Sequence, residues 1–343
     1  MSASYVYVSN AEDGCITTYS MRGDGSLEPR GRVAAEKTIG PLTVSPDKRW
    51  LIAASRSHPC AALTYGITNG ELSLKGKAPL PESFPYITLD RTGRFLLGAS
   101  YGGDTVSVNA VAPDGRVGEA LQVIPTARKA HAIITDRTNR YVFVPHLGTD
   151  QVLQFTFDPD SGRLSANTPP LVQLEPGVGP RHIRVSPDNR HAYLLNELTA
   201  TITTFALEGG LLKRQHSTST LAPGSKLVPG SPRPHQQDPS THIWAADIHV
   251  TPDGRLVFAS ERTSSTINAL RVDDGRLTYV GSTPTEKQPR AFGLDDAGRF
   301  MVVTGEKSDT ISSYAIEAGG ALKLVGKYPT AKGALWVEIV RFE

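Results

Sequence analysis

The segment GPRHIRVSPDNRHAYLLNEL, residues 179–198, has polar residues at both ends of a pair of short apolar runs. Arg181 and His182 precede the first run, and Asn196 and Glu197 close the second. A carboxylate or an imidazole can activate water or move a proton, a contribution of roughly 10²–10⁴ in rate. An arginine can stabilise an oxyanion or bind a carboxylate or phosphate through two hydrogen bonds. The segment therefore holds groups suited to acid–base chemistry on an anionic substrate, although Arg181 and Glu197 could equally form a structural ion pair.

The same pattern of strand end, polar turn, arginine and alternating apolar strand recurs along the chain. The copies are VSPDKRWLIAASR, LDRTGRFLLGASY, ITDRTNRYVFVPHL, VSPDNRHAYLLNE, VTPDGRLVFASER and LDDAGRFMVVTGE. The turn arginines are Arg49, Arg94, Arg140, Arg190, Arg255 and Arg299, at intervals of 45, 46, 50, 65 and 44 residues. In these turns proline presets φ, aspartate caps the turn, and glycine or asparagine accepts a positive φ, so each copy predicts a β-hairpin. Each interval leaves room for two more strands, and four strands in about 45 residues are typical of a propeller blade.

The two ends of the chain complete the pattern. Segment 333–340 matches the first strand of the repeat without its partner, and segment 4–11 matches the second strand without its predecessor. Together they predict one more blade, which closes the ring and removes exposed sheet edges. We therefore expect an all-β fold, a seven-bladed β-propeller of four-stranded antiparallel blades, as a single domain over residues 1–343. The longest interval contains a Pro- and Gly-rich loop insertion at about 221–243, and loops of that length are often functional.

Equivalent positions around the ring can be compared within this one sequence, because structural roles should recur in every blade and functional ones should not. Eight residues before the turn arginine stand Pro41, Tyr86, His131, His182, Asp247 and Ala291, and Trp336 has the equivalent position in the copy at the carboxyl end, which lacks the arginine. Seven residues after it stand Arg56, Tyr101, Leu147, Glu197, Arg262 and Glu306. Arg181 and Arg290 come one residue before the first of these positions. Since the innermost strand begins and the next strand ends at these positions, we expect the side chains to meet at one end of the central channel.

Simpler roles are open for several of these residues. His131 and His182 could be hydrogen-bonded channel residues without chemistry. Asp247 and His249 lie two apart on one strand face, as metal ligands can, but no third ligand stands at a convincing spacing. We therefore expect no metal, and expect Asp247 to be the partner of a histidine or an arginine. Trp244 is a candidate wall residue that can also contact a ligand.

Charge and terminal sequence disfavour several function classes. The 36 Lys plus Arg and 34 Asp plus Glu residues give a formal net charge of +2, without a basic block that could follow a phosphate backbone, so we expect no nucleic-acid partner. The amino terminus lacks the features of a signal peptide and no segment matches a membrane span, which predicts a cytoplasmic protein with no membrane contact.

Cys15 and Cys60 are expected to be buried free thiols. A closed ring has no obligatory interface, so we expect a monomer or a weak homo-oligomer.

Longer motifs point to one family. No G-x-S-x-G elbow, P-loop or dinucleotide fingerprint opens a βαβ unit, which disfavours covalent serine chemistry and nucleotide chemistry. Segment 179–198, WAADIHVTPDGRLVFASERT at 244–263 and TEKQPRAF at 285–292 resemble the seven-bladed propeller lactonase family typified by bacterial 6-phosphogluconolactonase. GASYGGDTVSV at 98–108 and GEKSDTISSY at 305–314 extend the similarity over nearly the whole chain. The resemblance implies hydrolysis of a sugar lactone without a cofactor, with 6-phosphogluconolactone of the oxidative pentose phosphate route as the usual substrate.

The resemblance also implies roles for individual residues. The family includes fungal carboxymuconate-lactonizing enzymes, whose proposed site combines a His, two Arg and a Glu. Those catalytic roles fall here on His131, Arg181, Glu197 and Arg262, with Glu197 or His131 as the general base and the two arginines stabilising the oxyanion. The residues expected to bind or orient the substrate are His182, Asp247, His249, Arg290, Asn196, Trp244, Arg56 and Tyr101.

The identity of the lactone stays open at this point. DPSTHIW at 238–244 and PHLGTDQV at 145–152 contain no lysine or arginine, whereas the resemblance to the phosphogluconolactonases implies basic residues there. Arg128, Lys129 and Lys307 could still supply the charge. An unphosphorylated aldono- or aldarolactone and a carboxymuconate-type isomerisation are therefore alternatives. A non-enzymatic scaffold is disfavoured, because the departures from the repeat gather at one end of the channel rather than over a broad surface.

Overall fold

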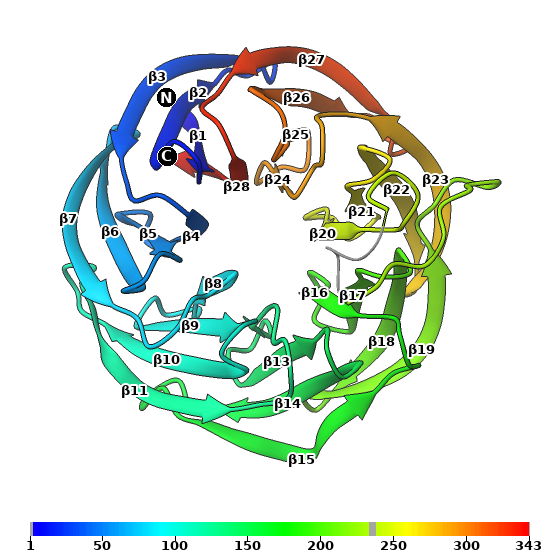
Figure 1. The fold of residues 1–343 in the computed structure, drawn as a ribbon, viewed down its shortest axis with the longest axis horizontal. Coiled ribbons are helices and arrows are strands. Elements are labelled where there is room, and N and C mark those ends of the chain that lie inside the picture. The colour runs from blue at the N-terminus through cyan, green and yellow to red at the C-terminus, as the bar shows by residue number, and fades with distance from the viewer. Residues whose placement is uncertain (1–2, 233–237, 343) are drawn as a thin grey trace.

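Seven four-stranded sheets stand around a common axis in the computed structural model, which describes residues 3–232 and 238–342 (Figure 1). Neighbouring strands of each sheet pair antiparallel, with the first strand of each repeat nearest the axis and the fourth at the rim. The structure thus confirms the predicted seven-bladed β-propeller. We number its blades from the sheet that begins with β4.

Each blade contains four strands that are consecutive in sequence, except the last. Blades 1 and 2 consist of β4 (Ile39–Val44), β5 (Trp50–Ser55), β6 (Ala61–Thr68), β7 (Glu71–Pro79), β8 (Tyr86–Leu89), β9 (Phe95–Ser100), β10 (Thr105–Val111) and β11 (Val117–Pro125). Blades 3 and 4 consist of β12 (Ile134–Thr135), β13 (Tyr141–His146), β14 (Gln151–Phe157), β15 (Leu164–Gln173), β16 (Pro180–Val185), β17 (His191–Asn196), β18 (Thr201–Glu208) and β19 (Leu211–Ser219). Blades 5 and 6 consist of β20 (Ala245–Val250), β21 (Leu256–Glu261), β22 (Thr266–Asp273), β23 (Arg276–Pro284), β24 (Ala291–Leu294), β25 (Phe300–Thr304), β26 (Thr310–Ile316) and β27 (Leu322–Pro329).

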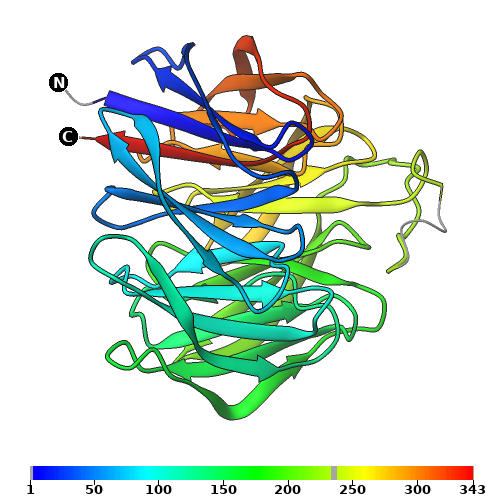
Figure 2. The same ribbon diagram turned by 60° about the vertical axis from the view of Figure 1, so that its left-hand side comes forward.

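Blade 7 closes the ring with strands from both ends of the chain, as the sequence predicts. It consists of β28 (Ala334–Phe342), β1 (Ala3–Asn10), β2 (Cys15–Met21) and β3 (Leu27–Ala34). β28 pairs antiparallel with β1, so that Trp336 stands opposite Ser9. Both described ends of the chain therefore lie side by side at one face of the ring (Figure 2). An open stack would expose the edges of its end blades, and this pairing removes them.

The hairpin turns explain why the repeat keeps its register. In blade 4, the backbone N–H of Ser186 donates to the carbonyl of His191 at 2.8 Å, and the Ser186 hydroxyl donates to Oδ1 of Asp188 at 2.5 Å. Asn189 has a φ of 60°, as the turn sequence predicts. These turns lie where the inner strand ends, and we call this side of the ring the turn face. The opposite side, where the inner strands begin, is the site face.

Neighbouring blades pack through one recurring contact. The glycine in the turn between the third and fourth strands of one blade lies against the residue that follows the turn arginine of the preceding blade. A Cβ on Gly115, whose φ is +80°, would stand 2.5 Å from Cδ2 of Trp50, so only glycine allows the aromatic ring to pack there. The same contact recurs for Gly162 with Phe95, Gly210 with Tyr141, Gly275 with His191 and Gly25 with Phe300, and Gly70 meets Tyr5 of blade 7, which has no turn arginine.

The insertion lies on the site face and is irregular. Its described part has no strand, only an isolated bridge between Val228 and His242, and Figure 2 shows it projecting on the side away from the chain ends. Residues 233–237 of the predicted insertion lie outside the described residues. Cys15 and Cys60 are free and buried, as predicted. Among the described residues there is no helix with the length and apolar character that a membrane crossing needs.

Candidate active site

The same backbone connection positions the charged side chains of the site face in successive blades. In four blades, a residue just after the second strand donates its N–H to a carbonyl just before the first strand. The pairs are Arg56 with Thr38 at 3.3 Å, Glu197 with Gly179 at 2.7 Å, Arg262 with Trp244 at 3.0 Å and Glu306 with Gln288 at 3.0 Å. Because the pairing of the hairpin strands fixes this register, the side chains start from equivalent corners of their blades.

An alternating series of guanidinium and carboxylate groups crosses the site face. Nε of Arg181 lies 2.7 Å from Oε2 of Glu197, and Nη2 of Arg262 lies 3.4 Å from the same oxygen. Nη1 of Arg262 lies 3.5 Å from Oε2 of Glu306, and Nη1 of Arg290 lies 3.8 Å from Oε1 of Glu306. The structure therefore brings together Arg181, Glu197, Arg262 and Arg290 as one cluster. It adds Glu306, to which the sequence assigned no role.

The centre of this cluster is buried. The side chains of Arg181 and Arg262 are only 1% and 2% exposed, so they need carboxylate partners to stay charged at low energy. Burial lowers the pKa of Arg181 to about 9, although the charge of Glu197 opposes this effect. Burial would raise the pKa of Glu306, but Arg290, Arg262 and Arg181 hold it below its ordinary value. The arginines are thus charged at neutral pH and can bind an anion.

Arg56 adds a fourth guanidinium at the edge of the cluster. Its Nε lies 3.4 Å from the Ser83 hydroxyl, and its side chain passes over Gly40, where a Cβ would stand 3.1 Å from the Arg56 Cδ. Burial, and then the positive charge of Arg290, lower the pKa of Arg56 to about 10, while Glu306 opposes them. Four arginines therefore share two glutamates, and the excess positive charge favours an anionic ligand.

His131 lies beside this cluster among aromatic rings. Its ring centroid is 5.6 Å from that of Tyr101 and 5.3 Å from that of His182. Its Nδ1 is buried without a hydrogen-bond partner among the described residues. Burial, reinforced by the charge of Arg181, holds the pKa of His131 well below 6.5. The imidazole is therefore neutral at physiological pH and has the capacity to accept a proton.

A hydrogen-bonded chain supports Arg181 from the channel. Nη1 of Arg181 lies 3.0 Å from Nε2 of His182, whose Nδ1 lies 2.9 Å from Oδ1 of Asp247. Nε2 of His249 lies 3.2 Å from the other carboxylate oxygen. Burial would raise the pKa of Asp247, but His249 and His182 hold it well below its ordinary value. Since an arginine can only donate, Nε2 of His182 is the acceptor and its proton is on Nδ1, facing Asp247.

Two aromatic side chains contact cations at the edge of the cluster. The Arg262 guanidinium carbon lies 3.5 Å from the centroid of the Trp244 ring, a close cation–π contact that fixes the plane of the guanidinium. Lys129 Nζ lies 5.0 Å from the centroid of Tyr101. Its ammonium group also donates to the carbonyl of Pro232 in the insertion, at 2.6 Å. Of the basic residues considered for a phosphate, Lys307 instead faces Glu12, with 3.8 Å between Nζ and Oε1.

The structure does not bring two of the candidates to the cluster: His249 contacts Asp247 on the turn-face side of the channel, and Asn196 points into its own blade. Its Nδ2 donates to the hydroxyls of Thr201 and Thr203 on β18, at 2.9 and 3.0 Å. Asn10 makes a similar bond to Thr17 in blade 7, at 3.2 Å, which indicates a structural role within the blade. Because successive side chains of a strand point to opposite faces, the neighbour of Glu197 points away from the cluster.

No group of three or more His, Cys, Asp or Glu side chains within residues 3–232 and 238–342 is arranged to hold a metal ion. The histidines closest to the cluster use their ring nitrogens differently. Asp247 engages both His182 and His249, and His131 contacts other rings. The arrangement is thus one of proton acceptors beside guanidinium groups, which suits the activation of water near a developing oxyanion.

Comparisons with known proteins identify the family and agree with the fold. The family model described as "Lactonase, 7-bladed beta-propeller" matches residues 3–339. A protein of Serratia proteamaculans named 6-phosphogluconolactonase is 36% identical over 340 residues, which cover 98% of both chains. A protein of Erwinia tasmaniensis with the same name is 34% identical over 342 residues, 98% of this chain and 99% of the relative.

Solved structures share the same architecture. The periplasmic gluconolactonase of Pseudomonas aeruginosa superposes with a TM-score of 0.86 at 25% sequence identity, over 99% of both chains. A protein from Lactobacillus plantarum superposes with the same TM-score of 0.86 at 23% identity, over 99% of this chain and 100% of that one, and supports the fold alone.

Proposed function

Because the chain belongs to the seven-bladed β-propeller lactonase family, we propose that it hydrolyses a sugar lactone, 6-phosphogluconolactone, to 6-phosphogluconate. The observation that carries this proposal is the end-to-end similarity to proteins named 6-phosphogluconolactonase, at 36% identity and 98% coverage of both chains. The cluster of Arg181, Glu197 and Arg262 beside His131 supplies the chemistry that such a reaction needs.

The charge of the cluster supports a phosphorylated substrate. Among the described residues, Arg56 and Arg290 share Glu306 as a carboxylate neighbour, and Nη1 of Arg290 is 3.8 Å from Oε1 of Glu306. A phosphate dianion would restore the balance, since a guanidinium binds phosphate through paired hydrogen bonds. We assign the phosphate to these two arginines, which leaves Arg181 and Arg262 for the lactone carbonyl.

In the reaction, His131 is the general base. Its neutral imidazole takes one proton from a water molecule as the water oxygen bonds to the lactone carbonyl carbon. The negative charge that forms on the carbonyl oxygen is stabilised by Arg181 and Arg262. The bond from the carbonyl carbon to the ring oxygen then breaks, and the imidazolium returns its proton to the leaving oxygen. The open-chain acid ionises at neutral pH and releases one proton to solvent.

Glu197 is the alternative base, and the geometry supports a different role for it. Its Oε2 accepts hydrogen bonds from Arg181 at 2.7 Å and from Arg262 at 3.4 Å. A proton added at that oxygen would displace both donors and leave two buried guanidiniums without their partner. We therefore assign Glu197 to holding the two arginines in position. His182 and Asp247 hold Arg181 from the other side.

Two further properties follow from this proposal. A phosphorylated sugar cannot cross a lipid bilayer unaided, so we propose that the enzyme acts in the cytoplasm, where such substrates form. We also propose a monomer or weak homo-oligomer, because the closed ring leaves no open stack edge that needs a partner.

The test is a pH-stat assay that follows the proton released on ring opening, corrected for spontaneous hydrolysis. The panel is 6-phosphogluconolactone, gluconolactone, galactonolactone and an aldarolactone. We expect the highest kcat/KM with 6-phosphogluconolactone, and a loss of at least about 100-fold in His131→Ala. If none of these lactones were hydrolysed faster than in buffer, the proposed function would be wrong.

Hydrolysis of an unphosphorylated aldonolactone is the second candidate. It is favoured by the structural similarity to the periplasmic gluconolactonase of Pseudomonas aeruginosa, at 25% identity over the whole chain. The same assay separates the two, because a higher kcat/KM for gluconolactone than for 6-phosphogluconolactone would keep the cluster and its chemistry but exclude the phosphate from Arg56 and Arg290.

A further inference from the structure

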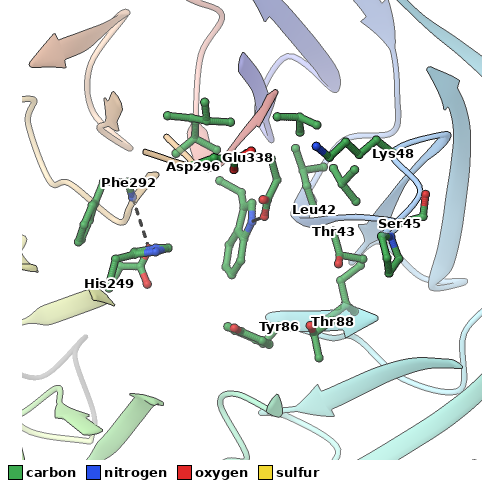
Figure 3. Close-up of a pocket in the computed structure, with 18 of the residues that line it drawn as sticks. Leu42, Thr43, Ser45, Lys48, Tyr86, Thr88, His249, Phe292, Asp296 and Glu338 are labelled. Atoms are coloured by element: carbon green, nitrogen blue, oxygen red, sulfur yellow. Dashed lines mark hydrogen bonds and ion pairs between the residues drawn. The ribbon is translucent and has the colours of Figure 1, made fainter. Parts of the chain in front are cut away.

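Three aromatic rings cross the channel beside the active site. The ring centroids of Tyr86, His182 and Trp336 lie between 5.1 and 6.1 Å apart. On the turn-face side of these rings lies a cavity of about 370 Å³, within the size range of small-molecule sites. Figure 3 shows side chains from different blades around this cavity, among them Thr43, Thr88, His249 and Glu338.

Arg184 lines this cavity and carries its principal buried positive charge. Nη1 of Arg184 donates to the Tyr86 hydroxyl at 2.6 Å, and Nη2 lies 3.5 Å from Oδ1 of Asp247. Asp247 is also the partner of His182 and His249, so one carboxylate serves three cationic or proton-donating groups. The Arg184 side chain keeps 18% exposure on the cavity wall. A guanidinium in this situation can still donate to a ligand.

A second cavity of about 400 Å³ adjoins the first and adds two more arginines. The two cavities share Thr43, Tyr86, Thr88 and Arg184 as wall residues. The second is also lined by Arg91 and Arg137, from the turns of blades 2 and 3.

These two arginines are held by backbone carbonyls rather than by carboxylates. Nε of Arg91 donates to the carbonyl of Asp136 at 2.6 Å, and Nη2 of Arg137 donates to the carbonyl of Val185 at 3.5 Å. Within the part of the chain that the structure describes, no ion pair joins either one to a carboxylate. Burial, and then the positive charge of Arg137, lower the pKa of Arg91, while the charge of Asp136 opposes them.

The carboxylates on the walls offset only part of this charge. Asp90 accepts from the backbone of Phe95 at 2.9 Å and from Asn139 in the turn of blade 3 at 2.8 Å, and among the described residues it forms no ion pair with Arg91 or Arg137. Burial raises the pKa of Glu338 to about 7, so this side chain is about half neutral at physiological pH. Lys48, Arg341 and Asp296 also line the first cavity, where Asp247 is the carboxylate nearest Arg184, at 3.5 Å.

We propose that the turn-face end of the channel is a second binding site, for a small multivalent oxyanion held by Arg91, Arg137 and Arg184. Three guanidinium groups line the two joined cavities, and each planar guanidinium can donate hydrogen bonds to two anionic oxygens. The site therefore matches a ligand with several such oxygens. The hydroxyls of Thr43 and Thr88 add further polar groups on the shared wall. The aromatic rings separate this site from the lactone cluster, so its ligand does not compete with the substrate.

Isothermal titration calorimetry tests the site with two probes, pyrophosphate for phosphate esters and citrate for polycarboxylates. The variants are the double substitution Arg91→Gln/Arg137→Gln, the control Arg255→Gln and the active-site substitution Arg290→Gln. Arg255 is a turn arginine of the same face, and its side chain is 84% exposed. We expect binding of at least one probe to weaken by about tenfold or more in the double variant. Binding at this site should be unchanged in Arg255→Gln and in Arg290→Gln.

The outcomes separate the explanations. Pyrophosphate binding alone assigns the site to phosphate esters, and citrate binding alone assigns it to polycarboxylates. Equal affinity in wild type and double variant, loss of all binding in Arg290→Gln, or no binding at millimolar concentration would each overturn the proposal. If the double variant failed to fold, Arg137→Gln alone carries the test, because among the described residues the Arg137 side chain makes a single hydrogen bond, at 3.5 Å. None of these measurements uses a lactone, so the result does not depend on the proposed function.

Discussion

The Nε atom of Arg181 lies 2.7 Å from Oε2 of Glu197, although 16 residues separate the two in sequence. The hairpin of β16 and β17 brings them together, and Arg262 from the next blade binds the same oxygen at 3.4 Å. If Glu197 contacted Arg181 alone, stabilisation of one hairpin would be enough to explain the ion pair. Because Glu197 Oε2 also accepts from Arg262 of the next blade, it fixes the distance between the two guanidinium groups.

Replacing Glu197 with glutamine should reduce both activity and stability. The amide is neutral and no longer offsets the charges of the two guanidiniums that donate to Glu197 Oε2, so Arg181 and Arg262 would repel each other and lose their spacing. We expect kcat/KM to fall by about 100-fold or more, by analogy with the loss of an oxyanion donor. The free energy of unfolding should fall by about 3 kcal/mol, because a buried guanidinium loses its partner. Initial rates and urea unfolding measure the two effects.

The matched control for this substitution is Glu208→Gln. Glu208 forms an exposed pair with Lys213, with side chains 61% and 60% exposed, so neither quantity should change appreciably. If Glu197→Gln lost stability but kept its kcat/KM, the Arg181–Glu197 pair would be structural only.

The pH dependence of kcat/KM should report His131. Burial and the charge of Arg181 hold its pKa well below 6.5, and the base must be neutral to act. Activity should therefore be constant from neutral pH down through 6.5 and decline only in more acidic solution. His131→Ala should lower kcat by about 10²–10⁴, whereas His216→Ala, at an exposed position of β19, should not. An acid limb centred at or above pH 6.5 would contradict the assignment of His131.

The ring and the core of the site could be predicted because both depend on local signals that repeat. Turn residues and alternating strands identify each hairpin, and the period assigns every residue to a ring position. Glu197 and Arg262 occupy the same ring position in adjacent blades, so their proximity follows from the fold. Glu306 occupies that position too, one blade further on, and the sequence therefore contained the signal for its place in the cluster.

The remaining contacts needed the structure, because they depend on side chains that cross between blades. Arg184 reaches the carboxylate of Asp247, which lies on the next blade, at 3.5 Å, and no period in the sequence indicates that contact. Asn196 shows the opposite case. Strand alternation alone separates it from its neighbour Glu197, so this candidate could have been excluded from the sequence.

Replacing Arg290 with glutamine should change substrate preference more than chemistry. Arg290 is assigned to the phosphate and lies 3.8 Å from Glu306, away from the Arg181–Glu197 contact. We expect kcat/KM for 6-phosphogluconolactone to fall by about 10- to 100-fold, the worth of one charged hydrogen-bonding group. The value for gluconolactone should change much less. Arg299→Gln, at an exposed turn position with a 62% exposed side chain, is the control. An equal loss for both substrates would remove Arg290 from the phosphate site.

Glu338 should make the protein less stable as the pH rises through neutrality. Burial raises its pKa from 4.5 to about 7, against a hydrogen bond from Trp336 Nε1 at 2.8 Å. Between these two pH values the folded state holds a proton that the unfolded state has released, so the free energy of unfolding falls as pH increases. The pKa shift corresponds to about 3 kcal/mol of folding stability, which is present at low pH and fully lost above pH 7.

Glutamine at position 338 mimics the protonated acid at every pH and should remove this dependence. In urea unfolding, Glu338→Gln should match wild type near pH 4.5 and exceed its stability by about 2–3 kcal/mol at pH 8. Glu317→Gln, at an exposed position after β26, should follow the wild-type curve at both pH values. Parallel curves for Glu338→Gln and wild type would show that the carboxyl is ionised in the folded state throughout this range, and Glu338 would then cancel part of the charge of Arg184 in the turn-face cavity.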